Sequence, residues 1–165
     1  MDFLEYMLHY FRGEKNLGYF LIVLGIAVLV FVGYLWQTHR DWLAYGMIIP
    51  LLLFGLAGIG GGAGLAYRTS KQIPELTNLY QADKPAFAAQ EEARMQKVNA
   101  NWPRLKLAYA VIIVISLGLF FLVKKDWMTG LTLALILVCA ILLIVDVFAE
   151  KRAIIYTEQI KLITS

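Results

Sequence analysis

Residues 42–67 have the sequence WLAYGMIIPLLLFGLAGIGGGAGLAY, in which no side chain is charged. A transmembrane helix needs about 20 consecutive apolar residues, and this stretch is longer than that. The composition of the whole chain agrees, because 60% of its 165 residues are hydrophobic and only 16% are charged. Ordinary soluble domains are less apolar. The sequence therefore predicts an all-α, polytopic membrane protein.

Glycines crowd the second half of this stretch. They are Gly55, Gly58, Gly60, Gly61, Gly62 and Gly64. Gly58 and Gly62 are four residues apart, as are Gly60 and Gly64, and such pairs let a second helix backbone approach closely inside a membrane. We predict that this row is a packing seam for another span or for a membrane partner.

Three further apolar runs accompany the first. The predicted membrane spans are residues 17–36, 42–67, 105–123 and 127–148. The polar links within each pair of spans are short, and short links make consecutive helices antiparallel neighbours. We predict four transmembrane helices arranged as two antiparallel hairpins in a single membrane domain.

The remaining segments are more polar. Residues 1–15 are predicted to form an amphipathic helix at the membrane interface, or else an appendage packed on the bundle. Residues 68–103 are predicted to be a water-facing loop with short helices, one of which begins at Asp83. Its apolar face could pack on the bundle or receive a partner; this face carries Phe87, Met95, Val98 and Trp102. Residues 149–165 are predicted to be a helical tail.

The basic residues indicate an orientation. Most Lys and Arg side chains fall in the N-terminal segment, the central loop and the tail, whereas the two short links carry few. By the positive-inside rule, both termini and the central loop are predicted to be cytoplasmic, in the inner (plasma) membrane of a bacterium. Trp36, Trp42 and Trp127 would then lie at the outer interface, a depth that tryptophan favours.

Asp146 is the acidic residue that lies inside an apolar run. A carboxylate within a membrane is by default a candidate functional site, because it must find a partner, reach water or become protonated. Its depth is expected to match that of residues 60–62 on the second span. The alternative is a structural role, in which Asp146 reaches the interface or pairs with Arg68 or Arg152.

The two outer links present small charged turns followed by tryptophans. The candidate outer-face contacts are Arg40, Asp41, Trp42, Asp126 and Trp127. They would keep the hairpins from sliding into the bilayer, and they are what a molecule arriving from outside would meet. The repeated order of basic, acidic and Trp residues is compatible with a duplicated hairpin or with convergence on an interface.

No arrangement of residues suggests catalysis. Cys139 lies in mid-span, and His9 and His39 lie on opposite sides of the membrane in the predicted topology. We therefore expect no enzymatic activity, no catalytic residues, no metal, no cofactor and no nucleic-acid partner. Lipid is the expected surrounding, and a homo-oligomer is possible.

Three functions remain open from the sequence. The first is an immunity or protective protein that binds a membrane-inserting toxin within the bilayer through the glycine seam. The second is a subunit of a small channel or transporter that uses Asp146 as a polar step. The third is a membrane anchor that recruits a cytoplasmic partner through residues 87–102 or the tail.

Overall fold

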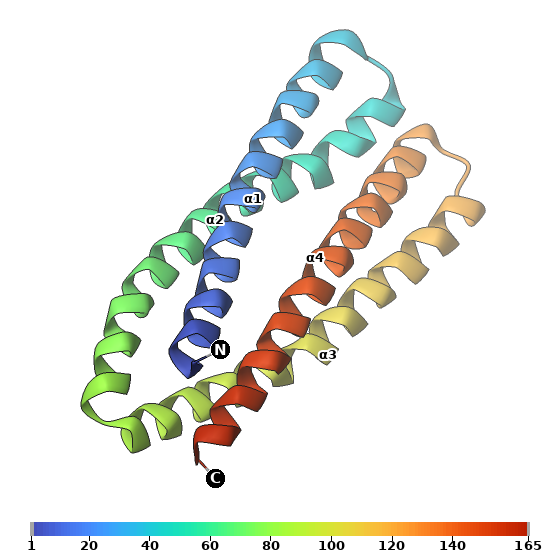
Figure 1. Cartoon of the computed structure of the whole chain (residues 1–165). Helices are drawn as coiled ribbons and strands as arrows, with labels where there is room; N and C mark the ends of the chain where they lie inside the picture. Colours follow the sequence, from blue (N-terminus) through green and yellow to red (C-terminus); the bar gives the residue numbers. More distant parts are fainter. Residues whose placement is uncertain (1, 165) are drawn as a thin grey trace.

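The computed structural model describes residues 2–164, which form four long helices (Figure 1). They are α1 Phe3–Thr38, α2 Trp42–Ala82, α3 Lys84–Leu122 and α4 Asp126–Thr164. All four are long and apolar enough to cross a membrane, which confirms the predicted all-helical class. At about 1.5 Å per residue each helix is about 54 to 61 Å long, whereas a bilayer's hydrocarbon core is about 30 Å thick. Each helix can therefore supply a span and a segment outside it.

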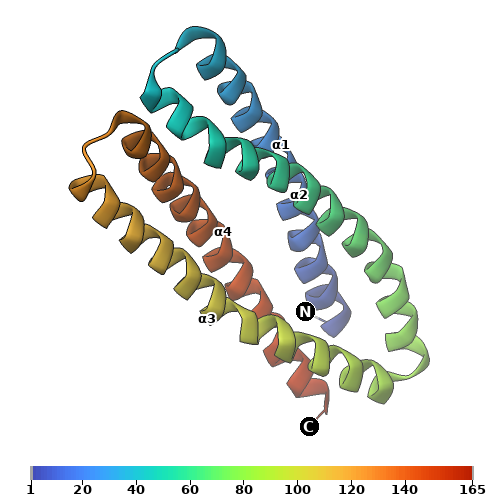
Figure 2. The ribbon, with the colours of Figure 1, turned by 180° about the vertical axis from the view of Figure 1, so that it is seen from behind.

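Consecutive helices run antiparallel (Figures 1 and 2). The turns at residues 39–41 and 123–125 lie together at one end of the molecule, here named the turn end. Both chain termini and the turn at Asp83 lie at the other, the terminal end. α1 packs mainly on α2, α3 mainly on α4, and α2 on α4. α2 and α4, which start at the same end, are thus parallel neighbours in the middle of the bundle.

The molecule has two halves of different character. The apolar half, at the turn end, comprises residues 17–36, 42–67, 105–122 and 127–148. The charged half, at the terminal end, comprises residues 3–16, 68–82, 84–104 and 149–163. All four helices run without interruption from one half into the other.

The central segment differs from its prediction as a loop with short helices. It consists of the last turns of α2 and the first turns of α3, and Asp83 alone separates them. Pro74 lies inside α2 and Pro103 inside α3. A proline removes one backbone hydrogen bond, and burial of Leu76 against the core holds α2 together beyond Pro74. Neither proline therefore ends its helix.

The predicted helix start at Asp83 is confirmed. Its side-chain Oδ1 accepts a hydrogen bond from the backbone N–H of Ala86 at 2.9 Å, which is the arrangement of a helix N-cap. Pro85 occupies the first turn of α3, where its missing N–H costs nothing. This single residue therefore reverses the chain between two helices of 41 and 39 residues.

The two ends of the chain are also continuous with long helices. Residues 3–15, predicted as a separate interfacial helix, are the first turns of α1, and Phe3, Met7 and Phe11 are buried there. The part of the tail up to residue 164 continues α4. Residues 1 and 165, which the predicted N-terminal helix and tail include, lie outside the described residues.

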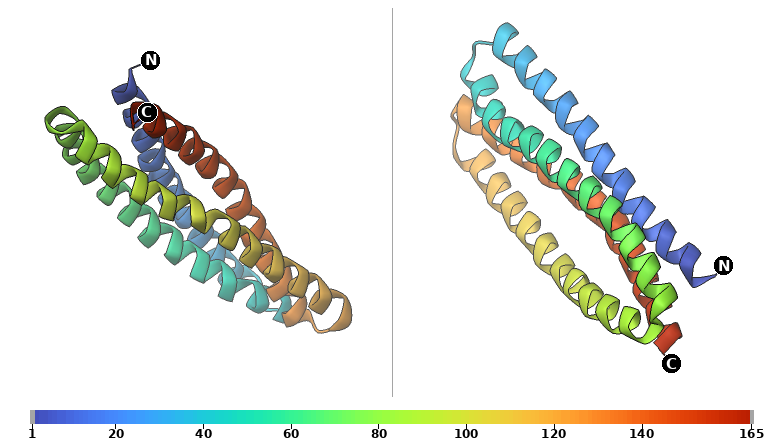
Figure 3. Two further views of the ribbon diagram at one scale, coloured as in Figure 1. Left: turned by 90° about the horizontal axis from the view of Figure 1, so that it is seen from below. Right: turned by 90° about the vertical axis from the view of Figure 1, so that its left-hand side faces the viewer.

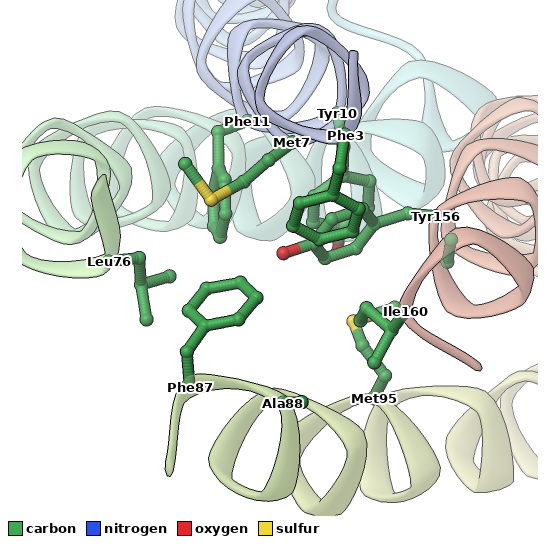
Figure 4. Packing of buried hydrophobic residues seen from close by; sticks show 11 residues of the cluster. Phe3, Met7, Tyr10, Phe11, Leu76, Phe87, Ala88, Met95, Tyr156 and Ile160 are labelled. Carbon is green, nitrogen blue, oxygen red and sulfur yellow. The ribbon is translucent and has the colours of Figure 1, made fainter. Parts of the chain in front are cut away.

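The charged half has an aromatic core to which all four helices contribute (Figure 4). The rings of Tyr10 and Tyr156 stack with centroids 4.6 Å apart, and Phe3 meets Phe87 edge-on at 5.6 Å. Met95 is fully buried in the same cluster. The apolar face predicted on residues 87–102 therefore packs on the bundle.

The apolar half has a smaller core drawn from α1, α2 and α4. It consists of Val32, Leu35, Ile48, Leu51, Phe54, Ala134 and Val138. The apolar segment of α3 lies outside it, beside α4 (Figure 3). Val114 and Leu122 are 68% and 82% exposed, whereas Ser116 is buried. Such exposure suits a helix that faces lipid tails, because burial of apolar side chains gains little there.

Candidate functional site

Three of the six seam glycines lie directly against α1. Gly55, Gly58 and Gly62 are buried. A Cβ built on Gly62 would lie 2.5 Å from the carbonyl oxygen of Gly18, and one on Gly58 would lie 3.1 Å from that of Leu21. The two helix backbones touch here, which a side chain would prevent. This part of the seam packs the chain against itself.

The other three seam glycines face away from α1. Gly60, Gly61 and Gly64 are exposed, and a Cβ built on any of them would meet no atom of residues 2–164 within 4 Å. Packing within the described chain does not explain why glycine stands at these positions. They form an open strip of bare helix backbone in the apolar half.

An apolar groove of about 390 Å³ between α2 and α4 leads towards this strip. It is lined by residues that include Ile49, Leu53 and Ala57 of α2 and Leu131, Leu135 and Leu142 of α4. Leu53, Ala57 and Gly61 follow one another at four-residue spacing, so they share one face of α2. Gly61 of the open strip thus lies on the same face of α2 as two residues that line the groove.

The predicted outer-face residues lie at the turn end and are exposed. The side-chain Oδ1 of Asp41 accepts a hydrogen bond from the backbone N–H of Ala44 at 2.8 Å, so Asp41 caps α2. An open hollow of about 440 Å³ joins the two turns, and it is lined by Trp42, Lys124, Lys125, Asp126 and Trp127. The structure therefore brings the two tryptophans together, while Arg40 lies outside this hollow.

Two glycines that our sequence analysis missed lie just below the turns. A Cβ on Gly46 would overlap the carbonyl oxygen of Trp127, and a Cβ on Gly130 would overlap that of Leu43. The contact is reciprocal, and it joins the hairpins through their backbones. A signal existed in the sequence, because each glycine follows an interfacial tryptophan by about one helical turn.

Asp146 belongs to α4, and its side chain lies near residues of α3. The Tyr109 side chain of α3 lies near its carboxylate, and Lys106 and Glu150, which form an ion pair with each other, are close by. The Oδ2 atom of Asp146 is buried, and no hydrogen-bond partner for it is found within residues 2–164. Arg152 was one of the partners considered from the sequence. Its Nη2 atom instead donates a hydrogen bond to Glu14 Oε1 at 3.4 Å.

The structure does not bring Asp146 against the open glycines. A Cβ at Gly60 or Gly61 would meet nothing of the described chain, Asp146 included. Arg68, the other partner considered from the sequence, lines a separate cavity beside α1. The carboxylate is therefore a feature of the α3–α4 pair.

A buried ion pair in the charged half was not predicted. Glu91 is fully buried and accepts two hydrogen bonds of 2.8 Å from the Arg94 guanidinium, from Nε and Nη2. The hydroxyl of Tyr156 donates a third, 3.1 Å long, to Glu91 Oε2. Glu91 lies four residues after Phe87 and four before Met95, so its place on the buried face could have been read from the spacing.

The surroundings of this pair affect its titration. Burial alone would lower the pKa of Arg94, but the hydrogen bonds and charge of Glu91 outweigh it and raise the pKa above the usual value. Burial raises the pKa of Tyr10 to about 12, with a contribution from the Glu14 charge. Burial also raises the pKa of Tyr156, to which the Glu91 charge adds. Arg94 is therefore charged and both tyrosines are neutral at every physiological pH.

The described residues offer little for covalent or metal chemistry. Within residues 2–164 no three His, Cys, Asp or Glu side chains come together in a way that could hold a metal ion. Cys139 is buried as a free thiol in the apolar half. Comparison of the chain with protein-family models, with curated proteins and with solved structures finds no match. The surfaces and polar groups described above are therefore the candidate functional features of the described residues.

Proposed function

We propose that the chain is a multi-pass protein of a bacterial inner membrane, with its apolar half in the bilayer and its charged half in the cytoplasm. The support is the distribution of basic residues, because the charged half carries most of them and the two turns few. The exposed tryptophans at the turn end suit the outer interface. In this arrangement the helices form two membrane hairpins that continue into a cytoplasmic bundle.

Within that arrangement, the proposed function is non-enzymatic: an immunity or protective protein that binds a membrane-inserting toxin in the bilayer. The observation that carries it is the open strip of Gly60, Gly61 and Gly64, which no residue of the described chain covers. A bare helix backbone lets a partner helix approach closely, and close packing is a main source of helix association in lipid. The adjoining α2–α4 groove extends the surface available to the partner.

Survival of bacteria that are challenged with a membrane-inserting toxin tests this function. Cells that express the wild-type chain should survive better than cells without it, and Gly60→Leu, Gly61→Leu and Gly64→Leu together should abolish the protection. Because these positions face open space, the variant should fold. The matched control is Gly33→Leu with Gly118→Leu, which also enter open space but on α1 and α3. Equal protection by the triple variant and the wild type would contradict the proposal.

A second candidate is a subunit of a small channel or transporter. The observation in its favour is the buried, unpartnered Oδ2 of Asp146 beside Tyr109 in the apolar half. Such carboxylates commonly mark ion or proton pathways. Purified protein in liposomes should then conduct ions, and Asp146→Asn should change the rate. Absence of flux in wild-type liposomes, with a known channel as a positive control, would rule this candidate out.

A further inference from the structure

A cavity of about 150 Å³ with a mixed polar and apolar lining lies where the charged half meets the apolar half. It is lined by side chains of α1, α2 and α3, among them Glu14, Arg68, Thr69, Gln72, Arg94 and Trp102. Because a water molecule takes about 30 Å³ in the liquid, the cavity has room for a small polar group and a few waters. Neither proposed function uses it.

The lining of this cavity is rich in hydrogen-bond donors. The indole Nε1–H of Trp102 is buried and has no hydrogen-bond partner among the described residues. Arg68 is exposed, and no hydrogen bond or ion pair of its guanidinium is found in the part of the chain that the structure describes. A buried donor without an acceptor is costly, so an acceptor that enters the cavity would be stabilising.

The charges around the cavity favour an anion. Arg94 is held in place by Glu91, and its guanidinium lies 5.2 Å from the centre of the Phe11 ring. Glu14 is the carboxylate among the lining residues, and its charge is met by Arg152. Among residues 2–164, Arg68 has no counter-charge, which leaves a net positive charge around the cavity.

The depth of the cavity suggests the source of the anion. Arg68 directly follows the apolar run of α2, and Trp102 shortly precedes that of α3. In the proposed topology both residues lie at the level of the inner lipid headgroups. Basic pockets between transmembrane helices on the cytoplasmic side are known to bind anionic headgroups. We propose that this cavity is a phosphate site, which takes the phosphate of an anionic phospholipid or a free phosphate between Arg68 and the indole N–H of Trp102.

Binding to the 165-residue chain in detergent tests the proposal, with tryptophan fluorescence as the readout. Three additions are compared: phosphatidylglycerol in mixed micelles, phosphatidylcholine in mixed micelles, and inorganic phosphate. The proposal predicts that phosphatidylglycerol changes the fluorescence at concentrations about tenfold or more below those needed for phosphatidylcholine, as a charge-assisted hydrogen bond would cause. A response to inorganic phosphate as well would support the site and show that the acyl chains are dispensable. No response to any of the three would overturn it.

Two variants and a matched control identify the site. Arg68→Gln should weaken binding of phosphatidylglycerol about tenfold or more, and because Arg68 is exposed the variant should fold normally. Trp102→Phe removes the donor but keeps a ring. It should abolish the fluorescence change, and native mass spectrometry should show weaker binding of phosphatidylglycerol. Lys71→Gln removes the same charge from α2 outside the cavity, where Lys71 lies 4.5 Å above the Tyr67 ring. A loss of affinity in Lys71→Gln equal to that in Arg68→Gln, or unchanged affinity in Trp102→Phe, would overturn the proposal.

Discussion

The charged half and the apolar half of the same four helices are held together in different ways. In the charged half, large side chains such as Phe87 and Tyr156 interlock around a buried ion pair. In the apolar half, backbones meet at glycines, and much of the α3 surface stays exposed. Water drives apolar side chains together, whereas lipid tails solvate them as well as another helix would. The change in packing along each helix therefore matches a change of solvent.

The largest effect is expected where the hairpins touch through their backbones. Gly130→Leu would place a side chain against the carbonyl group of Leu43, and α2 and α4 would have to separate. The cost should exceed about 5 kcal/mol, enough to unfold a protein of ordinary stability. The yield of monodisperse protein in detergent measures it. Gly118→Leu, which enters open space on α3, is the control and should behave like the wild type.

The buried ion pair gives the next largest effect. Glu91→Ala leaves the Arg94 guanidinium, whose side chain is 24% exposed, without its carboxylate, which should cost about 3 kcal/mol in the free energy of unfolding, the lower end of the range for buried pairs. Glu92→Ala, at the neighbouring and less buried position, should cost less than about 1 kcal/mol. Denaturant titration of the purified protein compares the two. Equal losses would show that the pair does not stabilise the charged half.

Truncating side chains in the two halves compares them directly. Met95→Ala in the charged half should destabilise the protein by about 2 to 5 kcal/mol, because it leaves a cavity in a packed core. Leu122→Ala at the exposed end of α3 should change stability by less than about 0.5 kcal/mol in detergent. Thermal unfolding of both variants measures the difference. A large loss in Leu122→Ala would mean that α3 has a partner in the apolar half.

High pH should lower the stability of the charged half, by less than the substitutions at Glu91 or Gly130 do. The pKa of Tyr10 is raised by burial to about 12, above its unfolded value of about 10. The stability that depends on neutral Tyr10 is therefore complete below pH 10 and is lost as the pH rises towards 12, a change on the order of 2 kcal/mol. Tyr10→Phe should lose less stability over this interval than the wild type. Melting temperatures at pH 9 and pH 11 provide the comparison.

The sequence was sufficient to predict the four apolar helices, because a long apolar run without charges has few structural alternatives to a membrane-spanning helix. It also indicated Asp83 as a helix start, since the residue precedes Pro85 as an N-cap should. The lengths of α2 and α3 were missed because Pro74 and Pro103 suggested breaks, and local signals do not show that tertiary packing continues past them.

The candidate site was predictable only in part. Helical spacing identified the glycines of α2, but which of them face α1 depends on how the helices cross, and that is a tertiary property. The reciprocal contact of Gly46 and Gly130 requires two hairpins to meet, so neither glycine is informative alone. Glu91 was missed for another reason: a charged residue on an apolar face was taken for a solvated one, although Arg94 stands three residues away.

Cysteine labelling tests the central claim, that one half of each helix lies in lipid and the other in water on the cytoplasmic side. Single cysteines at positions 37, 56, 78, 96 and 114, in a Cys139→Ala background, are treated with a membrane-impermeant maleimide. We predict labelling at 37 in intact cells, labelling at 78 and 96 only after lysis, and none at 56 or 114. Labelling of 78 or 96 in intact cells, or of 56 and 114 after lysis without detergent, would contradict it.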